Sequence, residues 1–393
     1  MKITLTACLI VSVLASCSTD RTGGFSTVPP PQIFTIKAPV AGNYPQGLYK
    51  YPYRAGSQTN ELFTQTLEWS PQVSKTFDTN TQYTATLTLV PVNMRQSFKG
   101  TTLDDVKGLP TDGVENISMK VKNRDLIIKI AFETTTSENA DAQILFSDEF
   151  EGESLDITKW NLCPEWDRQG RSSWRDNMVS INGGLLHLKF MRDTGLGKTK
   201  SSKKSLADNW IRSGAIRTQT KNGRTLFENA YGYYEAKIKF PVVRGTWGAF
   251  WLMSTTQWIT TDEGKDGTEI DIVESINNNR GRYNAAMHWN GYSDKLKSVS
   301  SGDIALPVNI YDGEFHIFAL DWSPSEYVFY VDGKIFWRSD GSAQFKNSGI
   351  NQNPNYIKLS VEGAEWAGNL PEDFTEAEML VDYVRVYNQP RCE

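Results

Sequence analysis

The sequence predicts an all-β protein built from two sandwiches, and three features of the chain support this prediction. Stretches of β-branched and aromatic residues recur along the chain, as in residues 83–90 and 126–130. Glycine-containing turns separate such stretches, for example at Asn182-Gly183-Gly184, Asn222-Gly223 and Asp332-Gly333. No amphipathic helix of three turns is visible, so we expect many short antiparallel strands.

Length and composition set limits on the function. The chain has 393 residues, enough for two domains, and its net charge of −5 argues against nucleic acid as a partner. Aromatic residues make up 12% of the chain. They fit either a large β core or flat platforms on which sugar rings stack.

The first residues are typical of an export leader. A positive Lys2 precedes the short apolar stretch 3–13, which ends in Leu14-Ala15-Ser16-Cys17. This ending resembles the bacterial lipobox, so we expect residues 1–17 to be a lipoprotein signal peptide with Cys17 as the acylated residue. The protein would then be an exported bacterial lipoprotein, held by its lipid at the outer membrane or the cell surface. The alternative is an ordinary signal peptide.

Composition divides the rest of the chain into a tether and two units. Residues 18–31, rich in Ser, Thr, Gly and Pro, predict a tether. Residues 32–134 are expected to form a small immunoglobulin-like sandwich. Since they contain no His, no Cys and no tight acidic cluster, we expect this sandwich to be a spacer, with glycan binding as the alternative. A polar linker at 134–141 leads to a larger unit at 144–390. This body contains Cys163 and Cys392, which either pair or remain free thiols.

The sharpest motif is a strand pattern with three acids, Gly267-Thr268-Glu269-Ile270-Asp271-Ile272-Val273-Glu274. Alternate residues of a strand share a face, so Glu269 and Asp271 point the same way. Glu274 would point the other way unless a β-bulge at 272–273 adds one residue. The spacing therefore predicts a bulge if the three acids cooperate.

Three acids on one face fit a specific chemistry. Neighbouring carboxylates push one pKa upward while another stays ionised. Retaining glycoside hydrolysis needs such a pair, a carboxylate nucleophile and a protonated acid about 5 Å apart. A solvated acidic strand face and a calcium site are the alternatives, although calcium carboxylates usually come from loops rather than from Val/Ile strands.

The flanking segments carry a resemblance to a known enzyme family. They are, in order, Phe146-Ser147-Asp148-Glu149-Phe150, Gly232-Tyr233-Tyr234-Glu235-Ala236, Trp247-Gly248-Ala249-Phe250-Trp251, the acid strand, and Val381-Asp382-Tyr383-Val384-Arg385-Val386-Tyr387. In this combination residues 144–388 resemble glycoside hydrolase family 16. The resemblance implies a concanavalin-like β-jelly-roll with an open cleft. It also implies Glu269 as nucleophile, Asp271 as its partner and Glu274 as general acid/base, with no cofactor required for catalysis.

The five-residue acid spacing is similar to the family's bulged branch, which includes laminarinases, agarases and carrageenases. The unbulged branch, with the lichenase spacing, has one residue fewer, so the resemblance favours a mixed β-1,3/1,4-glucan less than a β-1,3-glucan. We expect a monomeric endo-hydrolase of a polysaccharide, first of all a β-1,3-glucan. Two alternatives remain: a β-galactan endo-hydrolase of agarase, carrageenase or mucin type, and a non-catalytic carbohydrate-binding surface lipoprotein.

The resemblance further implies residues that bind substrate and metal. The expected substrate contacts are Trp247, Trp251, His288, Trp289, Arg217, Glu365 and Trp366, with a structural role as the alternative for the tryptophans and the histidine. Asp382 resembles the family's structural calcium ligand, joined by main-chain oxygens near Glu149 and Gly183. Such a Ca²⁺ ion would stabilise the fold and take no part in catalysis.

Overall fold

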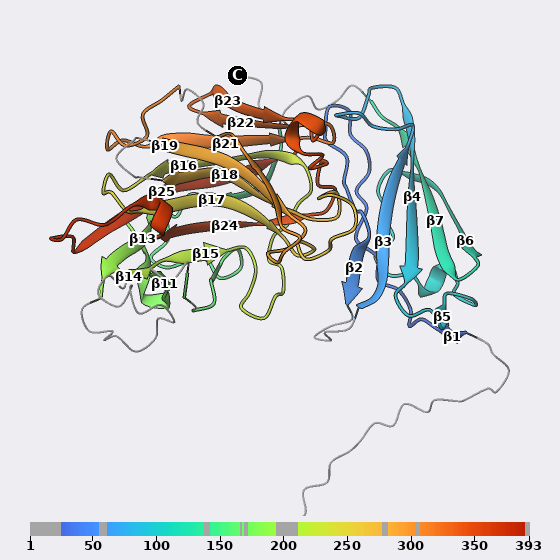
Figure 1. Cartoon of the computed structure of the whole chain (residues 1–393). Helices are drawn as coiled ribbons and strands as arrows, with labels where there is room; N and C mark the ends of the chain where they lie inside the picture. The colour runs from blue at the N-terminus through green and yellow to red at the C-terminus, as the bar shows by residue number, and fades with distance from the viewer. Residues whose placement is uncertain are drawn as a thin grey trace, which may run out of the picture.

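The computed structural model describes residues 25–54, 61–136, 142–165, 167–168, 172–193, 211–276, 282–302 and 307–389. These residues form two β-rich units that lie beside one another (Figure 1). The predicted signal peptide with Cys17, most of the tether, residues 137–141 of the linker, and Cys392 fall outside the described residues, whereas Cys163 is buried. Within the described ranges, no helix has the length and apolar character needed to span a bilayer.

The N-terminal unit contains one five-stranded antiparallel sheet. Its strands, in spatial order, are β2 (Tyr51–Arg54), β3 (Glu61–Ser70), β4 (Gln82–Pro91), β7 (Asp125–Thr134) and β6 (Val114–Lys122). A parallel pair of two-residue strands, β1 (Ser26–Thr27) and β5 (Gln96–Ser97), lies apart from it.

The immunoglobulin-like prediction differs from the structure in one respect, because the described residues of this unit include no second sheet of comparable size. The irregular segment 28–48 takes that place, and its Val28, Ile33 and Ile36 join the same apolar core as Phe63. Five prolines in this segment have no N–H group, so they cannot donate to a strand ladder.

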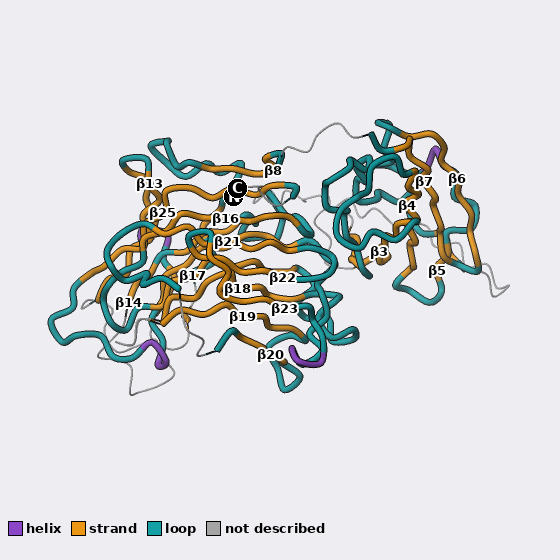
Figure 2. The backbone as a smooth tube through the Cα atoms, turned by 90° about the horizontal axis from the view of Figure 1, so that it is seen from above, coloured by secondary structure: helices purple, strands orange, loops and turns teal. Residues whose placement is uncertain are grey.

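The second unit consists of two largely antiparallel sheets, as the jelly-roll prediction requires (Figure 2). The larger sheet follows the order β10 (Asp167–Arg168), β11 (Ser172–Trp174), β14 (Ile211–Ser213), β13 (Leu185–Arg192), β25 (Glu376–Tyr387), β16 (Gly232–Lys239), β21 (His316–Trp322), β22 (Tyr327–Val331) and β23 (Lys334–Ser339), with β12 (Val179–Asn182) and β8 (Ile144–Asp148) at its side. The smaller sheet follows the order β20 (Lys297–Ser300), β19 (Arg282–Trp289), β18 (Thr268–Ile276), β17 (Trp247–Ser254), β24 (Asn355–Glu362), β15 (Ala215–Arg217) and β9 (Asn161–Leu162). One large apolar core contains side chains from both sheets.

Strand β24 shows how the smaller sheet presents a second, polar face. All eight of its residues are buried. Ile357, Leu359 and Val361 belong to the apolar core, whereas the alternate residues 356, 358, 360 and 362 line a cleft. Because successive side chains of a strand point to opposite faces, this strand closes the core on one side and forms a cleft floor on the other.

The N-terminal unit is joined to the second unit by buried contacts. Tyr44 packs in the apolar core of the second unit, its N–H donates to the carbonyl of Asn388 at 3.1 Å, and its hydroxyl donates to Asp321. The side chain of Asn353 exchanges two hydrogen bonds with the main chain of Tyr49. These contacts fix the N-terminal unit against the second unit, and its role as a spacer stays a prediction.

Candidate active site

The acid strand β18 lies between β17 and β19 in the smaller sheet, and it contains the predicted bulge. Residues 250 and 251 of β17 face residues 273 and 271 of β18, which leaves Ile272 without an opposite residue. The register of the pairing between β18 and β19 shifts as well, between Asp271 and Glu274. Ile272 and Val273 both point into the core, and the bulge therefore brings all three acids, Glu269, Asp271 and Glu274, to one cleft.

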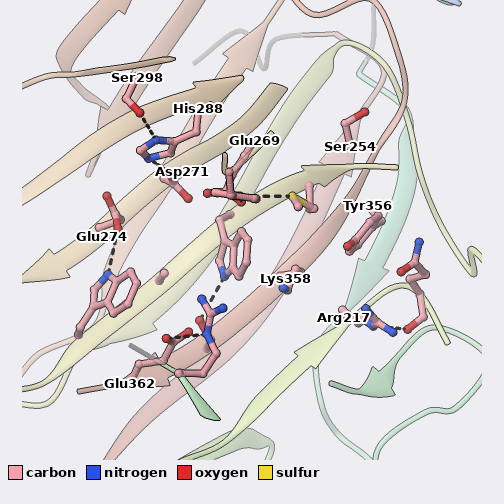
Figure 3. Close-up of a pocket in the computed structure, with 18 of the residues that line it drawn as sticks. Arg217, Ser254, Glu269, Asp271, Glu274, His288, Ser298, Tyr356, Lys358 and Glu362 are labelled. Carbon is pink, nitrogen blue, oxygen red and sulfur yellow. Dashed lines mark hydrogen bonds and ion pairs between the residues drawn. The ribbon is translucent and has the colours of Figure 1, made fainter. Parts of the chain in front are cut away.

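This cleft has a volume of about 850 Å³. Five neighbouring strands contribute its lining side chains: Arg217 from β15, Lys358 from β24, Trp247 and Trp251 from β17, the acids from β18, and His288 from β19 (Figure 3). A row of functional side chains thus crosses the strands of the smaller sheet, as a groove for an extended polymer would require.

Glu274 carries the features of a general acid/base. Its two carboxylate oxygens accept hydrogen bonds from Trp247 Nε1 at 3.0 Å and from Asn284 Nδ2 at 2.9 Å. Burial, together with the negative charge of Asp271, raises the pKa of Glu274 to about 7. A carboxyl group with this pKa is available in both protonation states near neutral pH, as acid/base catalysis needs.

Glu269 carries the features of a nucleophile. It is buried, and the hydroxyl of Tyr292 donates a hydrogen bond to its carboxylate. Burial raises the pKa of Glu269, while the charge of His288 and the hydrogen bond from Tyr292 act in the opposite direction. The latter two contacts therefore favour the ionised form that attacks a sugar carbon.

His288 and Asp271 form an ion pair beside the nucleophile. The Nε2 atom of His288 lies 3.3 Å from the Asp271 carboxylate, and its Nδ1 lies 2.6 Å from Ser298 Oγ. Burial lowers the pKa of His288, but Asp271 and the two glutamates outweigh this effect and raise it to about 9. The ring is therefore protonated at neutral pH.

The same cluster is also the candidate for a metal ion among the described residues. Ligand atoms of Glu269, Asp271 and His288 lie within 4.8 Å of one another. A metal ion would need the neutral imidazole, whereas the acids around His288 favour its protonated form. The arrangement fits an ion pair better than a metal centre.

The aromatic residues predicted for the cleft lie there with one exception. Trp247 and Trp251 both line it, and the indole Nε1 of Trp251 donates to Ser360. Trp366 is 45% exposed and meets Trp247 edge to face, with ring centroids 5.0 Å apart. Trp247 and Trp366 form an aromatic wall next to Glu274. Glu365 begins the short turn η5 (Glu365–Ala367), but its side chain lies outside the described residues.

The prediction that Trp289 binds substrate is wrong. Its side chain is fully buried in the apolar core, and its Nε1 donates to Glu263 at 3.2 Å. The preceding residue, His288, faces the cleft, so the alternation of a strand turns Trp289 to the opposite face.

Arg217 lines the cleft, but its guanidinium group is directed to the main chain. Nε donates to the carbonyl of Gln219 at 3.0 Å, and a terminal nitrogen donates to the carbonyl of Thr220 at 2.7 Å. These contacts fix the loop that follows β15 at the rim of the cleft.

The residues predicted for calcium are engaged by cations. Asp382 forms an ion pair with Lys237 at 2.6 Å, and Glu149 forms two hydrogen bonds with Arg385 at 2.7 and 2.9 Å. Gly183 lies in the turn between β12 and β13. A Ca²⁺ ion at Asp382 would have to compete with Lys237, whereas the main-chain oxygens expected near Glu149 and Gly183 are not occupied by these ion pairs. The calcium site stays a prediction.

Several cleft residues were missed by the sequence analysis. Lys358, Arg168, Trp258 and Tyr292 line the cleft, and behind this lining Trp174 contacts Lys358 while Asn284 donates to Glu274. The period-two pattern of 355–362 offered a signal for Lys358, because it places a lysine on the face opposite Ile357 and Leu359. Trp258 and Tyr292 lie outside the regular strands, where no periodicity indicates which way a side chain points.

The fold and the paired carboxyl groups define a glycoside hydrolase. The chain belongs to glycoside hydrolase family 16, since residues 142–389 match the family model described as "Beta-porphyranase A-D, GH16 domain". The structure shares its fold with an endo-β-1,3-glucanase from Pyrococcus furiosus. That likeness has a TM-score of 0.50 and 24% identity, and it covers 63% of this chain and 94% of that one.

Two curated relatives show similar identities but different names. A "Beta-glucanase" from Rhodothermus marinus is 27% identical over 62% of this chain and 85% of its own length. A "Keratan-sulfate endo-1,4-beta-galactosidase" from Sphingobacterium multivorum is 28% identical over 65% of this chain, and the match spans 57% of that enzyme. The protein is thus similar to enzymes that act on glucans and to enzymes that act on galactans.

Proposed function

We propose that this protein is a retaining endo-hydrolase that cuts internal β-linkages of a sulfated β-galactan. The endo-glycosidase chemistry follows from the family and from the acid strand. The polymer is our inference, and the single observation that carries it is the buried cation Lys358 on the floor of the cleft, beside the catalytic acids.

The two glutamates divide the reaction between them. The Glu269 carboxylate attacks the anomeric carbon while Glu274 gives its proton to the glycosidic oxygen, so the carbon–oxygen bond breaks and a glycosyl ester forms on Glu269. Glu274 then removes a proton from water, and this water displaces Glu269 from the anomeric carbon. Two inversions give net retention.

Aromatic side chains lie near each of the two glutamates. Trp247 and Trp366 lie at Glu274, and Tyr292 with Trp258 lies at Glu269, with ring centroids of the latter pair 5.3 Å apart. Platforms next to both acids let sugar units bind on either side of the scissile bond, which supports cleavage inside a polymer.

Lys358 is placed to meet an anionic group. Its Nζ atom lies 3.7 Å from the ring centre of Trp251 and 4.8 Å from that of Trp174. Within the described residues, no carboxylate lies within ion-pair distance of this nitrogen. Burial lowers the pKa of Lys358 to about 8, and a bound sulfate would favour the charged ammonium.

Arg168 and Arg217 add positive charge to the same part of the cleft. Arg168 lies 4.4 Å from the ring centre of Trp174 and pairs with Glu362 at 2.9 Å. A neutral glucan can offer this buried ammonium only hydroxyl groups, whereas a sulfate ester offers a negative charge. The match to a porphyranase family model and the similarity to a keratan-sulfate galactosidase support the same substrate class.

A neutral β-1,3-glucan or mixed-linkage glucan is the second candidate. The similarity to the Rhodothermus marinus β-glucanase, which spans 85% of that enzyme, favours it. In that case the ammonium of Lys358 would donate to sugar hydroxyl groups.

A substrate comparison separates the two candidates. Purified enzyme is assayed on porphyran, agarose, keratan sulfate, laminarin and lichenan, with Lys358→Gln as the variant. We expect the highest kcat/KM on a sulfated galactan, and we expect Lys358→Gln to lose more activity on that polymer than on its desulfated form. Fastest cleavage of laminarin, or an equal loss on both forms, would reject the sulfated galactan.

The localisation of the protein is a proposal that rests on the leader sequence. A lipid on Cys17 would attach the enzyme to the outer membrane or cell surface, where a large polysaccharide can reach it. Labelling with a radioactive fatty acid in the native host tests this. We expect label in the wild type and none in Cys17→Ala, whereas label in both would place the lipid elsewhere.

A further inference from the structure

The contact between the two units reaches the loop that precedes the nucleophile. Asn353, which is fully buried, accepts a hydrogen bond from the N–H of Tyr49 at 2.7 Å and donates to the carbonyl of Tyr49 at 2.8 Å. The same amide nitrogen lies 3.0 Å from the carbonyl of Asp266. Asn353 thus ties the N-terminal unit to a residue that lies three positions before Glu269.

Two side chains next to Tyr49 hold the same loop from outside. The Nζ atom of Lys50 lies 2.5 Å from Asp262 Oδ2. The hydroxyl of Tyr51 donates to Glu228 at 2.7 Å and lies 3.5 Å from Thr255 Oγ1. Thr255 begins the loop 255–266 and lines the cleft. The N-terminal unit therefore contacts this loop at Thr255 and Asp262 and, through Asn353, at Asp266.

The fit between the units leaves no room for a side chain at Gly47. A Cβ atom on this residue would lie 2.6 Å from the carbonyl oxygen of Gln352 and 2.8 Å from the ring of Tyr231. Tyr44 is buried on the same side. The segment 44–51 is therefore a docking segment, which keeps the N-terminal unit at one place on the catalytic unit.

The loop 255–266 connects this docking segment to the reaction centre. It carries Trp258, which is 64% exposed and lines the cleft. The ring of Trp258 meets Tyr292 edge to face, and Tyr292 donates its hydroxyl hydrogen to Glu269. A shift of the loop would therefore move Trp258, a sugar platform next to Tyr292.

We propose that the N-terminal unit is a working part of the glycan-binding cleft: its segment 44–51 positions the loop 255–266, and through it Trp258, for binding of a long polysaccharide. Lys50 and Tyr51 are positioning residues in this account, since they touch the loop and not the sugar. Figure 1 shows β2, which begins with Tyr51, on the side of the N-terminal unit that faces the second unit.

The test is a cycle of variants in the full chain, Lys50→Ala/Tyr51→Phe, Trp258→Ala and their combination. The substrate is whichever polysaccharide the wild type cleaves fastest, so an error in the proposed polymer leaves the test intact. We expect the double variant to raise KM for the polymer about fivefold with kcat nearly unchanged. The double variant should cleave a short chromogenic oligosaccharide that does not reach Trp258 with the kcat and KM of the wild type.

The combined variant gives the decisive comparison. If the contacts act through Trp258, then Lys50→Ala/Tyr51→Phe should add no further rise in KM once Trp258 is absent. Lys50→Arg should keep the wild-type KM, and amide hydrogen exchange of 255–266 should be faster in the double variant. Lys120→Ala, on the exposed face of the far strand β6, serves as the control and should change nothing.

Two results would overturn the proposal. Effects on KM that multiply independently in the combined variant would show that the contacts do not act through Trp258. A wild-type KM and unchanged hydrogen exchange in the double variant, with the protein folded by thermal melting, would show that the N-terminal unit does not position the loop.

Discussion

The indole Nε1 of Trp247 donates a 3.0 Å hydrogen bond to Glu274, the carboxyl group whose pKa is raised to about 7. This contact favours the ionised form and therefore opposes the burial that raises the pKa. The same tryptophan meets Trp366 at the cleft wall. One side chain thus helps to set the acidity of the proton donor and to build the sugar platform beside it.

Loss of this hydrogen bond should shift the decline of activity at alkaline pH to higher pH. In Trp247→Phe, Glu274 loses one donor to its ionised form, so its pKa should rise by about one unit. Because Glu274 must be protonated to act as the acid, the decline of kcat/KM at high pH should then begin at higher pH. A pH–rate profile measures this, and a limb that moves to lower pH would contradict the hydrogen-bond account.

Removal of the charge on Asp271 should shift the decline of kcat/KM at high pH in the opposite direction. The negative charge of Asp271 helps to raise the pKa of Glu274, so Asp271→Asn should lower that pKa and bring the decline to lower pH. In the wild type we expect kcat/KM to fall above about pH 7, as Glu274 ionises, and to fall at acid pH, as Glu269 becomes protonated. A single pH–rate series with both variants shows whether the two shifts differ in sign.

Loss of either glutamate should stop turnover without unfolding the protein. Glu274→Ala should reduce kcat by about 10²- to 10⁴-fold, the contribution of one acid/base group. Glu269→Ala should be inactive with water but should form an α-linked glycosyl azide when azide is supplied with an activated substrate. Thermal melting provides the control, and a variant that keeps near-wild-type turnover would remove its glutamate from the mechanism.

Deletion of Ile272 should remove the bulge and leave a folded protein. This residue has no opposite partner on β17, so its loss restores regular pairing and keeps every later side chain on its present face. We expect a lower melting temperature, because a buried isoleucine is lost, and reduced but measurable activity. Deletion of Ile357 from β24, whose pairing with β17 shows no register shift, is the matched control and should abolish folding. If the Ile272 deletion also unfolds the protein, Ile272 is not the extra residue of a bulge.

The sequence predicted best where a residue's role follows from the period of its own strand. The spacing of Glu269, Asp271 and Glu274 required a bulge, and the structure has one at Ile272. The same period-two rule, applied to 288–289, would have separated His288 in the cleft from Trp289 in the core. The same rule would also have placed Lys358 on the cleft face of its strand.

Other features depend on contacts that no local pattern contains. Tyr44 is 277 residues away from Asp321, its hydrogen-bond partner, and Tyr49 is 304 residues away from Asn353. Hence the docking of the N-terminal unit was not visible in its sequence, which has no His, no Cys and no tight acidic cluster to draw attention. A second sheet of comparable size is absent from the described residues of that unit for a related reason, since the prolines of 28–48 cannot donate to a strand ladder.

The stereochemistry of the first product tests the central claim most directly. Proton NMR of a rapid reaction on the best polymer shows the anomeric signal of the new reducing end before mutarotation. Double displacement by Glu269 and Glu274 predicts that the β-anomer appears first and that the α-anomer grows in later. Initial formation of the α-anomer would contradict the double-displacement mechanism, because a single attack by water inverts the anomeric carbon.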